Sequence, residues 1–223
     1  MLSVAAAKRE QTPRQIERRQ RILASARDLV SQHGCDAVSM RAIAAASGVT
    51  EKTLFNIFGN KDGLLAAAAY ERSASVFVLA SDLVPVPGWE WLIALCDAVA
   101  NVTLEAPEMA RALAGAVIDH LEMTGLAQLY DRHVGQAMRA MVEQGVLAEA
   151  APLALLSHLV QLAMVSGVGF WAKGDLWDEE LRPFLHLRLA ETLLSHAKSG
   201  LPAMQQTVFA AQQSLAQRFP PRL

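Results

Sequence analysis

The side chains best suited to a specific chemistry are the cations near the start of the chain. Residues 1–61 hold ten Lys and Arg against five Asp and Glu, a net charge of +5, whereas the whole chain of 223 residues carries −2. The remaining 162 residues therefore carry −7. Arg14, Arg18 and Arg21 follow one another at spacings of four and three, so they form a cationic stripe on one face of a helix. A basic head on an acidic body indicates that only the head meets phosphate.

Groups for catalysis or metal binding do not occur at recognisable spacings in the sequence. The two cysteines cannot build a disulfide framework, and no Cys pair or Cys/His cluster has zinc-ligand spacing. The acid and histidine pairs Asp119-His120 and Asp131/His133 have no accompanying nucleophile motif or glycine-rich phosphate loop. The sequence therefore predicts a binding protein of a reducing compartment, with no enzymatic activity, no metal and no cofactor.

The elements that must position the cations are helices. Helical spacing recurs from end to end, and no segment alternates apolar and polar residues for long enough to make a strand. Helices are expected over residues 13–33, 40–46, 51–58, 61–79, 89–104, 107–122, 125–144, 152–173, 178–199 and 203–217. The predicted fold is all-α, with a tail over residues 1–13, a basic head over 14–60 and a larger helical body over 61–223.

Two short helices in the head have the signals of a helix-turn-helix. Ser39 and Thr50 are good N-caps for them, and Gly34 is a stop signal for the preceding helix, because glycine favours a helix C-terminus. The tight turn at residues 47–49 separates the two helices. The apolar side chains expected to fix their angle are Ile43, Val49, Leu54 and Phe58. Asn60 is placed to cap the long helix that joins head and body.

These motifs occur together in an order that is specific to one family. The segments concerned are Arg21-Ile22-Leu23-Ala24-Ser25-Ala26, Gly34, Val38-Ser39-Met40-Arg41-Ala42-Ile43-Ala44, Ser47-Gly48-Val49-Thr50, Thr53-Leu54-Phe55, Phe58 and Lys61-Asp62-Gly63-Leu64-Leu65. Over residues 15–65 the sequence resembles, without a gap, the DNA-binding domain of the TetR family of transcriptional regulators. The body resembles the family only in length and helical content.

The resemblance implies that the head is a DNA-binding domain. In such a domain the second helix of the motif lies in the major groove, and the first supports it across the backbone. Lys52 and Asn56 then meet base edges or phosphates, and Lys61 matches the lysine that the family uses against phosphate at the start of the fourth helix. The expected DNA-binding residues are Arg14, Arg18, Arg41, Thr50, Glu51, Lys52, Thr53, Phe55, Asn56 and Lys61.

Two positions depart from the commonest pattern of the family. Phe55 stands where the family often has a tyrosine whose hydroxyl touches phosphate, and Ile57 stands where histidine is frequent. Both residues are apolar, so they preserve the fold but remove a polar contact at the DNA backbone. An alternative hypothesis is therefore a TetR-like ligand-binding protein with weak or lost DNA binding.

The resemblance also implies that the body binds a small-molecule effector, largely apolar, and forms a homodimer. Candidate pocket residues are apolar, aromatic or polar side chains on the body helices. They are His120, Tyr130, His133, Met138, His158, Gln161 and Phe170. For any one Met or aromatic residue, packing in the core is the competing interpretation. His158 and Gln161 interrupt an apolar helix and need hydrogen-bond partners, which the dimer interface could equally provide.

Helices 152–173 and 178–199 are too apolar for one chain to cover easily, so they are expected to pair with their symmetry mates. Small residues allow a close approach, and leucines at a spacing of four form a stripe. The expected interface residues are Ala163, Ser166, Gly167, Leu181, Leu185, Leu189 and Leu193. The function implied is a homodimeric repressor that effector binding releases from a palindromic operator on double-stranded DNA.

The longest apolar run, residues 153–172, is nearly long enough to cross a membrane. Ser157, His158, Gln161 and Ser166 interrupt it, and it lacks basic flanks, so a buried helix is the better interpretation. The N-terminus has the wrong order of charged and apolar residues for a secretory signal. The sequence thus predicts no membrane association and a location in the bacterial cytosol.

Overall fold

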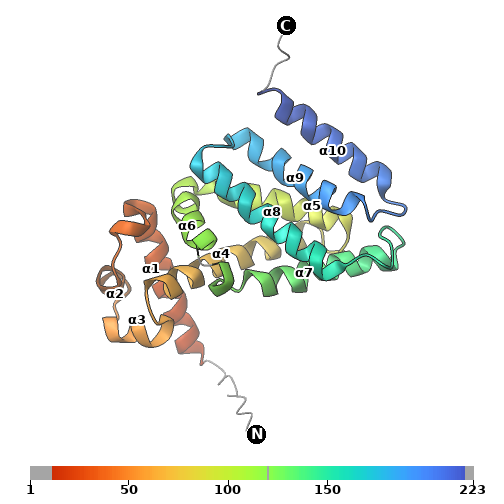
Figure 1. Cartoon of the computed structure of the whole chain (residues 1–223). Helices are drawn as coiled ribbons and strands as arrows, with labels where there is room; N and C mark the ends of the chain where they lie inside the picture. The colour runs from red at the N-terminus through yellow and green to blue at the C-terminus, as the bar shows by residue number, and fades with distance from the viewer. Residues whose placement is uncertain (1–11, 120, 219–223) are drawn as a thin grey trace.

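A computed structural model describes residues 12–119 and 121–218, and over these ranges the protein is built of helices. The head contains α1 (Pro13–Ala37), α2 (Met40–Ser47) and α3 (Glu51–Phe58). The body contains α5 (Trp89–Glu105), α6 (Pro107–Asp119), the short 3₁₀ helix η1 (Leu121–Met123), α7 (Leu126–Glu143), α8 (Leu153–Lys173), α9 (Asp178–Leu194) and α10 (Leu201–Ala216). Helix α4 (Lys61–Leu83) runs from the head into the body (Figure 1). The expected all-α fold is confirmed.

Capping side chains explain where the helices of the head begin. Thr12 and Gln15 form a reciprocal capping box before α1, and Pro13 occupies the first helical position, where no N–H is needed. The Ser39 hydroxyl accepts a hydrogen bond from the amide of Ala42 at 3.1 Å. Each cap satisfies an amide that the helix itself leaves without a partner. The predicted starts of α2, α3 and α4 are therefore confirmed.

Several helix ends differ from those expected, among them the ends of α1, α4 and α9 and that of α6, which is at Asp119 rather than at residue 122. Gly34 does interrupt α1, with a φ of 78°, but the chain continues helically beyond this kink to Ala37. Helix α4 continues beyond the expected end at residue 79, to Leu83. Helix α9 ends at Leu194 rather than at residue 199. Its following residues instead pair with the segment after α7, where the amide of Lys198 donates to the carbonyl of Val146 at 2.7 Å.

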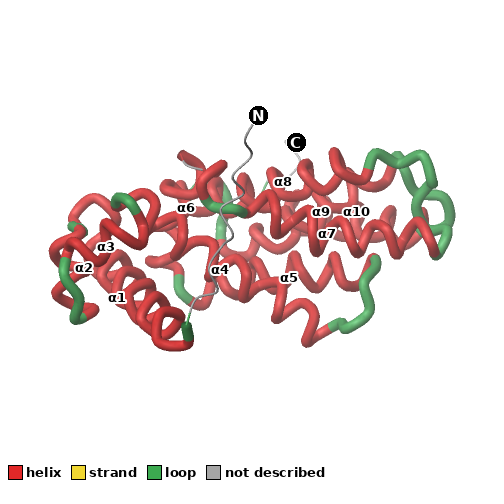
Figure 2. The backbone as a smooth tube through the Cα atoms, turned by 90° about the horizontal axis from the view of Figure 1, so that it is seen from below, coloured by secondary structure: helices red, strands yellow, loops and turns green. Residues whose placement is uncertain are grey.

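Two hydrophobic cores hold the molecule together. The core of the head includes Ile22, Leu23, Ile43 and Leu54, all fully buried. The core of the body lies among α4, α5, α7, α8 and α9. The first half of α4 contributes to the head and its second half to the body, so the helix couples the two (Figure 2). Burial of this apolar surface is the main source of stability.

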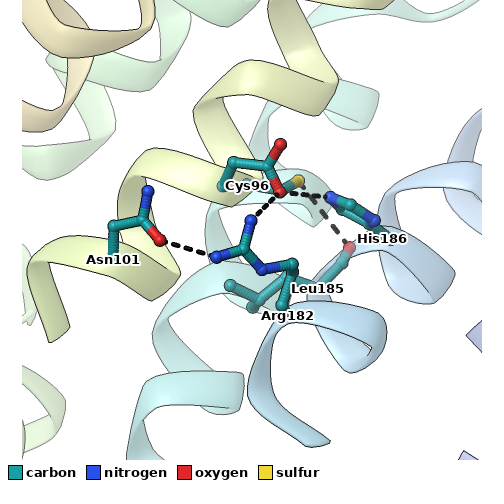
Figure 3. Close-up of polar contacts among 6 residues, drawn as sticks. Cys96, Asn101, Arg182, Leu185 and His186 are labelled. Atoms are coloured by element: carbon teal, nitrogen blue, oxygen red, sulfur yellow. Dashed lines mark hydrogen bonds and ion pairs between the residues drawn. The ribbon is translucent and has the colours of Figure 1, made fainter. Parts of the chain in front are cut away.

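A polar network fastens α9 to α5 at the edge of the body core. Arg182 donates to the Asp97 carboxylate at 3.1 Å and to Asn101 at 2.6 Å, and His186 contacts the same carboxylate at 2.9 Å (Figure 3). Burial by itself raises the pKa of Asp97, but the hydrogen bond and charge of His186, together with Arg182, lower it below its ordinary value. The carboxylate is thereby held in its charged form.

Helices α4 and α8 are both long and apolar enough to cross a membrane. In each, 44% of the most apolar stretch is buried inside the protein. A core helix can have the same composition. Helix α8 packs against α6, α7 and α9, which is the buried setting that the sequence indicates for it.

Candidate DNA-binding surface and ligand cavity

The turn between α2 and α3 has a defined geometry. Gly48 adopts the left-handed conformation, with a φ of 66°, and its amide caps α2 on the carbonyls of Ala44 and Ala45. Beneath the turn, the fully buried side chains of Ile43 and Leu54 join the two helices. Such a packed turn fixes the angle of α3, so its outer face is presented as a rigid surface.

The outer face of α3 is polar, except for one aromatic ring. Glu51, Lys52 and Asn56 are exposed, whereas Thr53 is half-buried. The Thr50 hydroxyl caps the helix by accepting from the amide of Thr53 at 3.2 Å. The outer face can thus donate and accept hydrogen bonds in a groove of DNA.

Phe55 and Ile57, the two departures from the family pattern, differ in exposure. The ring of Phe55 is 49% exposed on α3, and Ile57 packs partly buried against the core of the head. Arg41, on α2, is exposed. Phe55 therefore contributes an apolar contact surface where a hydroxyl is frequent in the family, and Ile57 contributes mainly to packing.

The start of α4 continues the surface of α3. The Asn60 side chain accepts a hydrogen bond from the amide of Gly63 at 2.8 Å, which caps the helix. Lys61, at the first helical position, is half-buried. A Cβ atom at Gly63 would collide with the backbone carbonyl oxygen of Phe58, so the close approach of α3 and α4 requires glycine here. The cation and the free amides at a helix N-terminus both attract phosphate.

Some arginines of α1 point to solvent, and others contact the rest of the head. Arg14 is exposed, and Arg18 is half-buried with an Nε that has no hydrogen-bond partner among the described residues. Arg21, expected in the same stripe, donates to the carbonyl of Ser47 at 3.1 Å and so supports the helix-turn-helix from behind. Arg19 lies over the ring of Phe58, 4.7 Å from its centre. Sequence spacing alone did not reveal these two structural roles.

The head contacts the body through α6 as well as through α4. The Cys35 thiol donates to the carbonyl of Ala112 at 2.7 Å, and Leu113 is buried in the core of the head. Arg27 of α1 forms an ion pair with Glu71 of α4 at 3.1 Å. A displacement of α4 or α6 is therefore passed on to the head, because tightly packed side chains transmit strain.

A cavity of about 110 Å³ lies in the body, lined by residues of α4, α5, α6, α7 and α8. Most of the lining is apolar. Its polar members are Arg72, Ser73, Thr103 and Tyr130. An apolar pocket with a few polar groups is the usual form of a small-molecule site.

The residues expected in the effector pocket are not all brought together. Tyr130 lines the cavity, whereas Met138 is buried in the core outside its lining. His133 stacks on Phe77, with ring centres 5.0 Å apart. The others lie on α8 or outside the described residues: His158 and Phe170 are exposed, Gln161 is buried, and His120 falls in the gap between the described ranges. Arg72 was not among the expected residues, although a cation within an apolar helix is a visible signal.

The leucine stripe of α9 faces inward. Leu181, Leu185, Leu189 and Leu193 are fully buried in the core of their own chain, so they are not available to a second copy. Gly167 is buried against Leu185, and a Cβ there would approach that side chain to 2.6 Å. A groove lies between the outer faces of α8 and α9. It includes Ala163 and Ser166 together with exposed Leu155, Leu159, Leu162 and Phe170.

Fold and surface together define a helix-turn-helix protein with a separate, cavity-containing helical body. The family model for bacterial regulatory proteins of the tetR family matches residues 22–68, which include the helix-turn-helix and the start of α4. This match confirms that the head resembles the TetR family of transcriptional regulators, as its motifs indicate. No curated protein matches the sequence significantly.

Solved structures of TetR-family regulators share the fold over most of the chain. SmeT, the repressor of the Stenotrophomonas maltophilia multidrug efflux pump SmeDEF, is 20% identical with a TM-score of 0.58, covering 82% of this chain and 92% of that one. FadR of Thermus thermophilus, a TetR-family repressor solved with lauroyl-CoA, is 20% identical with a TM-score of 0.64, covering 78% and 92%. RolR, solved with resorcinol, is 17% identical with a TM-score of 0.62, covering 86% and 93%.

Proposed function

We propose that this TetR-family regulator is a sequence-specific homodimeric repressor of the bacterial cytosol, released from a palindromic operator by a small-molecule effector. The observation that carries the proposal is the continuous polar surface of α3 and the start of α4. Lys52 and Asn56 project from the outer face of α3, and Lys61 lies at the adjoining helix N-terminus. One rigid unit can thus contact both the base edges and the phosphates of DNA.

Arg41 of α2 and Glu51 of α3 extend the same surface, and Arg14 and Arg18 add charge from α1. We assign Arg41, Arg14 and Arg18 to phosphate contacts, because their long cationic side chains suit the DNA backbone. Thr50 and Thr53 order the start of α3 through their mutual hydrogen bond at 3.0 Å. Phe55 packs against sugar or thymine methyl groups with its exposed ring.

The homodimer would form through the groove of α8 and α9. Four large apolar side chains, Leu155, Leu159, Leu162 and Phe170, are between 39% and 53% exposed there. A contiguous apolar surface of this kind favours burial against a partner. In a dimer with two-fold symmetry the two α3 helices would lie about 34–36 Å apart, which is one turn of DNA. Such a dimer would read a palindromic operator.

The cavity among α4 to α8 is the proposed effector site. Its wall includes α4, which also forms part of the core of the head. An effector that binds one arrangement of α4 more tightly than another shifts the heads toward that arrangement. The ligands named for the two relatives, lauroyl-CoA and resorcinol, support a ligand-responsive body without identifying the ligand of this protein.

The direct test is selection of the purified protein against a random double-stranded DNA pool at about 150 mM salt, where non-specific attraction to phosphate is weakened. We expect enrichment of a palindrome and a dimeric mass in solution. Failure of a folded dimer to enrich any sequence would overturn the proposal in favour of a DNA-silent, ligand-binding relative, the alternative that Phe55 and Ile57 favour. Turnover of a small molecule would instead indicate an enzyme.

Substitutions in the two parts of the surface should have different effects. Lys61→Ala is expected to weaken binding to all sequences and to reduce the slope of log K against log salt by roughly 1, because one phosphate is no longer neutralised. Asn56→Ala is expected to change the preferred base at one position of each half-site. Titration of selected and scrambled DNA at several salt concentrations distinguishes them. The docking arrangement is wrong if neither variant changes binding.

A further inference from the structure

The cavity of the body contains one charged side chain among its lining residues. Arg72 reaches it from α4 and is half-buried. Its guanidinium donates to the backbone carbonyl of Val102 and, at 3.6 Å, to the sulfur of Met109. Within the described ranges no carboxylate forms an ion pair with it. Arg72 is thus a cation in an apolar pocket, paired only with neutral groups.

The surroundings of Arg72 disfavour its charge. Burial lowers the pKa of its guanidinium, and the positive charge of Arg27 lowers it further, whereas Glu105 acts in the opposite direction. Arginine nevertheless remains protonated in proteins, so the charge persists at a cost in solvation. An anion entering the cavity would supply a counter-charge in a medium where charges interact strongly.

Three hydroxyl groups share the lining with Arg72. They belong to Ser73, Thr103 and Tyr130, and none of the three hydroxyls makes a hydrogen bond with another described residue. Burial raises the pKa of Tyr130, so its phenol stays neutral and can donate. A cation beside hydroxyl donors suits a carboxylate, which accepts several hydrogen bonds at once.

We propose that the cavity binds a small organic monocarboxylate, whose anionic group pairs with Arg72 and whose compact apolar part occupies the rest of the lining. The inference rests on the proposed function, since it names the class of effector for the same site. A cavity of about 110 Å³ limits the size of the apolar part. For comparison, an apolar cavity of roughly 150 Å³ holds benzene. The apolar part is therefore at most the size of a single ring or a short aliphatic chain.

Arg72 is also placed to couple an anion in the cavity to the head. Its second contact, Met109 of α6, packs against the core of the head. Its neighbour Glu71 holds Arg27 of α1. A carboxylate that draws the guanidinium away from Val102 and Met109 changes the contact between α4 and α6 where the head is attached. The anion thereby acts on DNA binding through Arg72, which lines the cavity and contacts Met109 at the core of the head.

The test compares carboxylates with their neutral isosteres. Benzoate and hexanoate are titrated into the full-length protein by calorimetry, beside benzamide and hexanamide, and each is added to the complex with the selected DNA. We expect at least one carboxylate to bind roughly tenfold or more tightly than its amide, as one charge-assisted contact allows. That carboxylate should also shift DNA affinity.

Arg72→Gln should abolish the preference for the anion, whereas Arg72→Lys should retain part of it. The matched control is Arg111→Gln, which removes an exposed arginine that lies over Trp171, outside the lining of the cavity. Thermal unfolding of each variant shows whether it is folded. If Arg72→Gln does not fold, the comparison of acids with amides in the unchanged protein tests the inference by itself.

The inference is overturned if the amides bind as tightly as the acids, if neither acid binds, or if folded Arg72→Gln keeps the preference. If the protein binds its selected DNA but binds neither acid, the carboxylate inference is wrong and the proposed DNA-binding function still holds. Conversely, tight binding of an acid by a protein that selects no DNA would contradict the proposed repressor alone.

Discussion

Replacing Leu54 with alanine is expected to lower the free energy of unfolding of the head by about 2–5 kcal/mol. The side chain is fully buried between α3 and the rest of the head core, so the substitution reduces the apolar surface buried on folding and leaves a cavity. Because α3 is held to α2 mainly through this core, the variant should also have much weaker affinity for the selected DNA. Chemical denaturation and DNA titration measure the two effects.

Phe55→Ala is the matched control, since Phe55 is the next residue on the same helix and is 49% exposed. A surface substitution of this kind changes stability by only about 0.5 kcal/mol or less. Its effect should appear in DNA affinity alone. Equal decreases in stability for the two variants would show that the packing described for α3 is wrong.

Gly63→Ala, at the start of α4, is expected to destabilise the protein and to weaken DNA binding. The added Cβ meets the backbone carbonyl oxygen of Phe58, which cannot move without shifting the end of α3. Overpacking of this kind costs about 1–3 kcal/mol. Because the shift also displaces Lys61 and the recognition surface, affinity for the selected DNA should fall roughly tenfold or more, which corresponds to about 1.4 kcal/mol.

Gly115→Ala provides the control for glycine replacement itself. Gly115 lies within α6, and a Cβ there would meet no atom within 4 Å. Alanine is the better helix former by about 1 kcal/mol, so this variant should be as stable as the original protein or more so. The steric explanation for Gly63 fails if both variants are destabilised alike, or if Gly63→Ala binds DNA normally.

The groove of α8 and α9 differs from the interface expected from the leucine spacing. A spacing of four places Leu181 and Leu185 on one face of α9. This spacing is the same whether that face packs into the protein's own core or against a second copy, so the sequence does not distinguish the two. In the structure that face packs into the core of the body, whereas Leu155 and Leu159 of α8 are exposed.

The ligand cavity could not be located from the sequence for a related reason. Its lining comes from five helices, α4 to α8, and from residues nearly one hundred positions apart along the chain, such as Arg72 and Met164. Aromatic and polar residues on the body helices are the natural candidates, but of those that the structure describes only Tyr130 reaches the lining. Arg72 stands out in the sequence as a cation within an apolar helix, but its position next to Glu71 is equally typical of an exposed charged pair.

The all-α fold, the caps of the head and the helix-turn-helix follow from the amino-acid sequence alone, because they depend on interactions within a few residues. Ser39, Thr50 and Asn60 cap the helices that they were expected to cap. Three features became visible only in three dimensions: which faces of α8 and α9 are buried, the support of Ser47 by Arg21, and the place of Arg72 in a cavity. These features depend on contacts between helices far apart in the chain, for which local spacing carries no information.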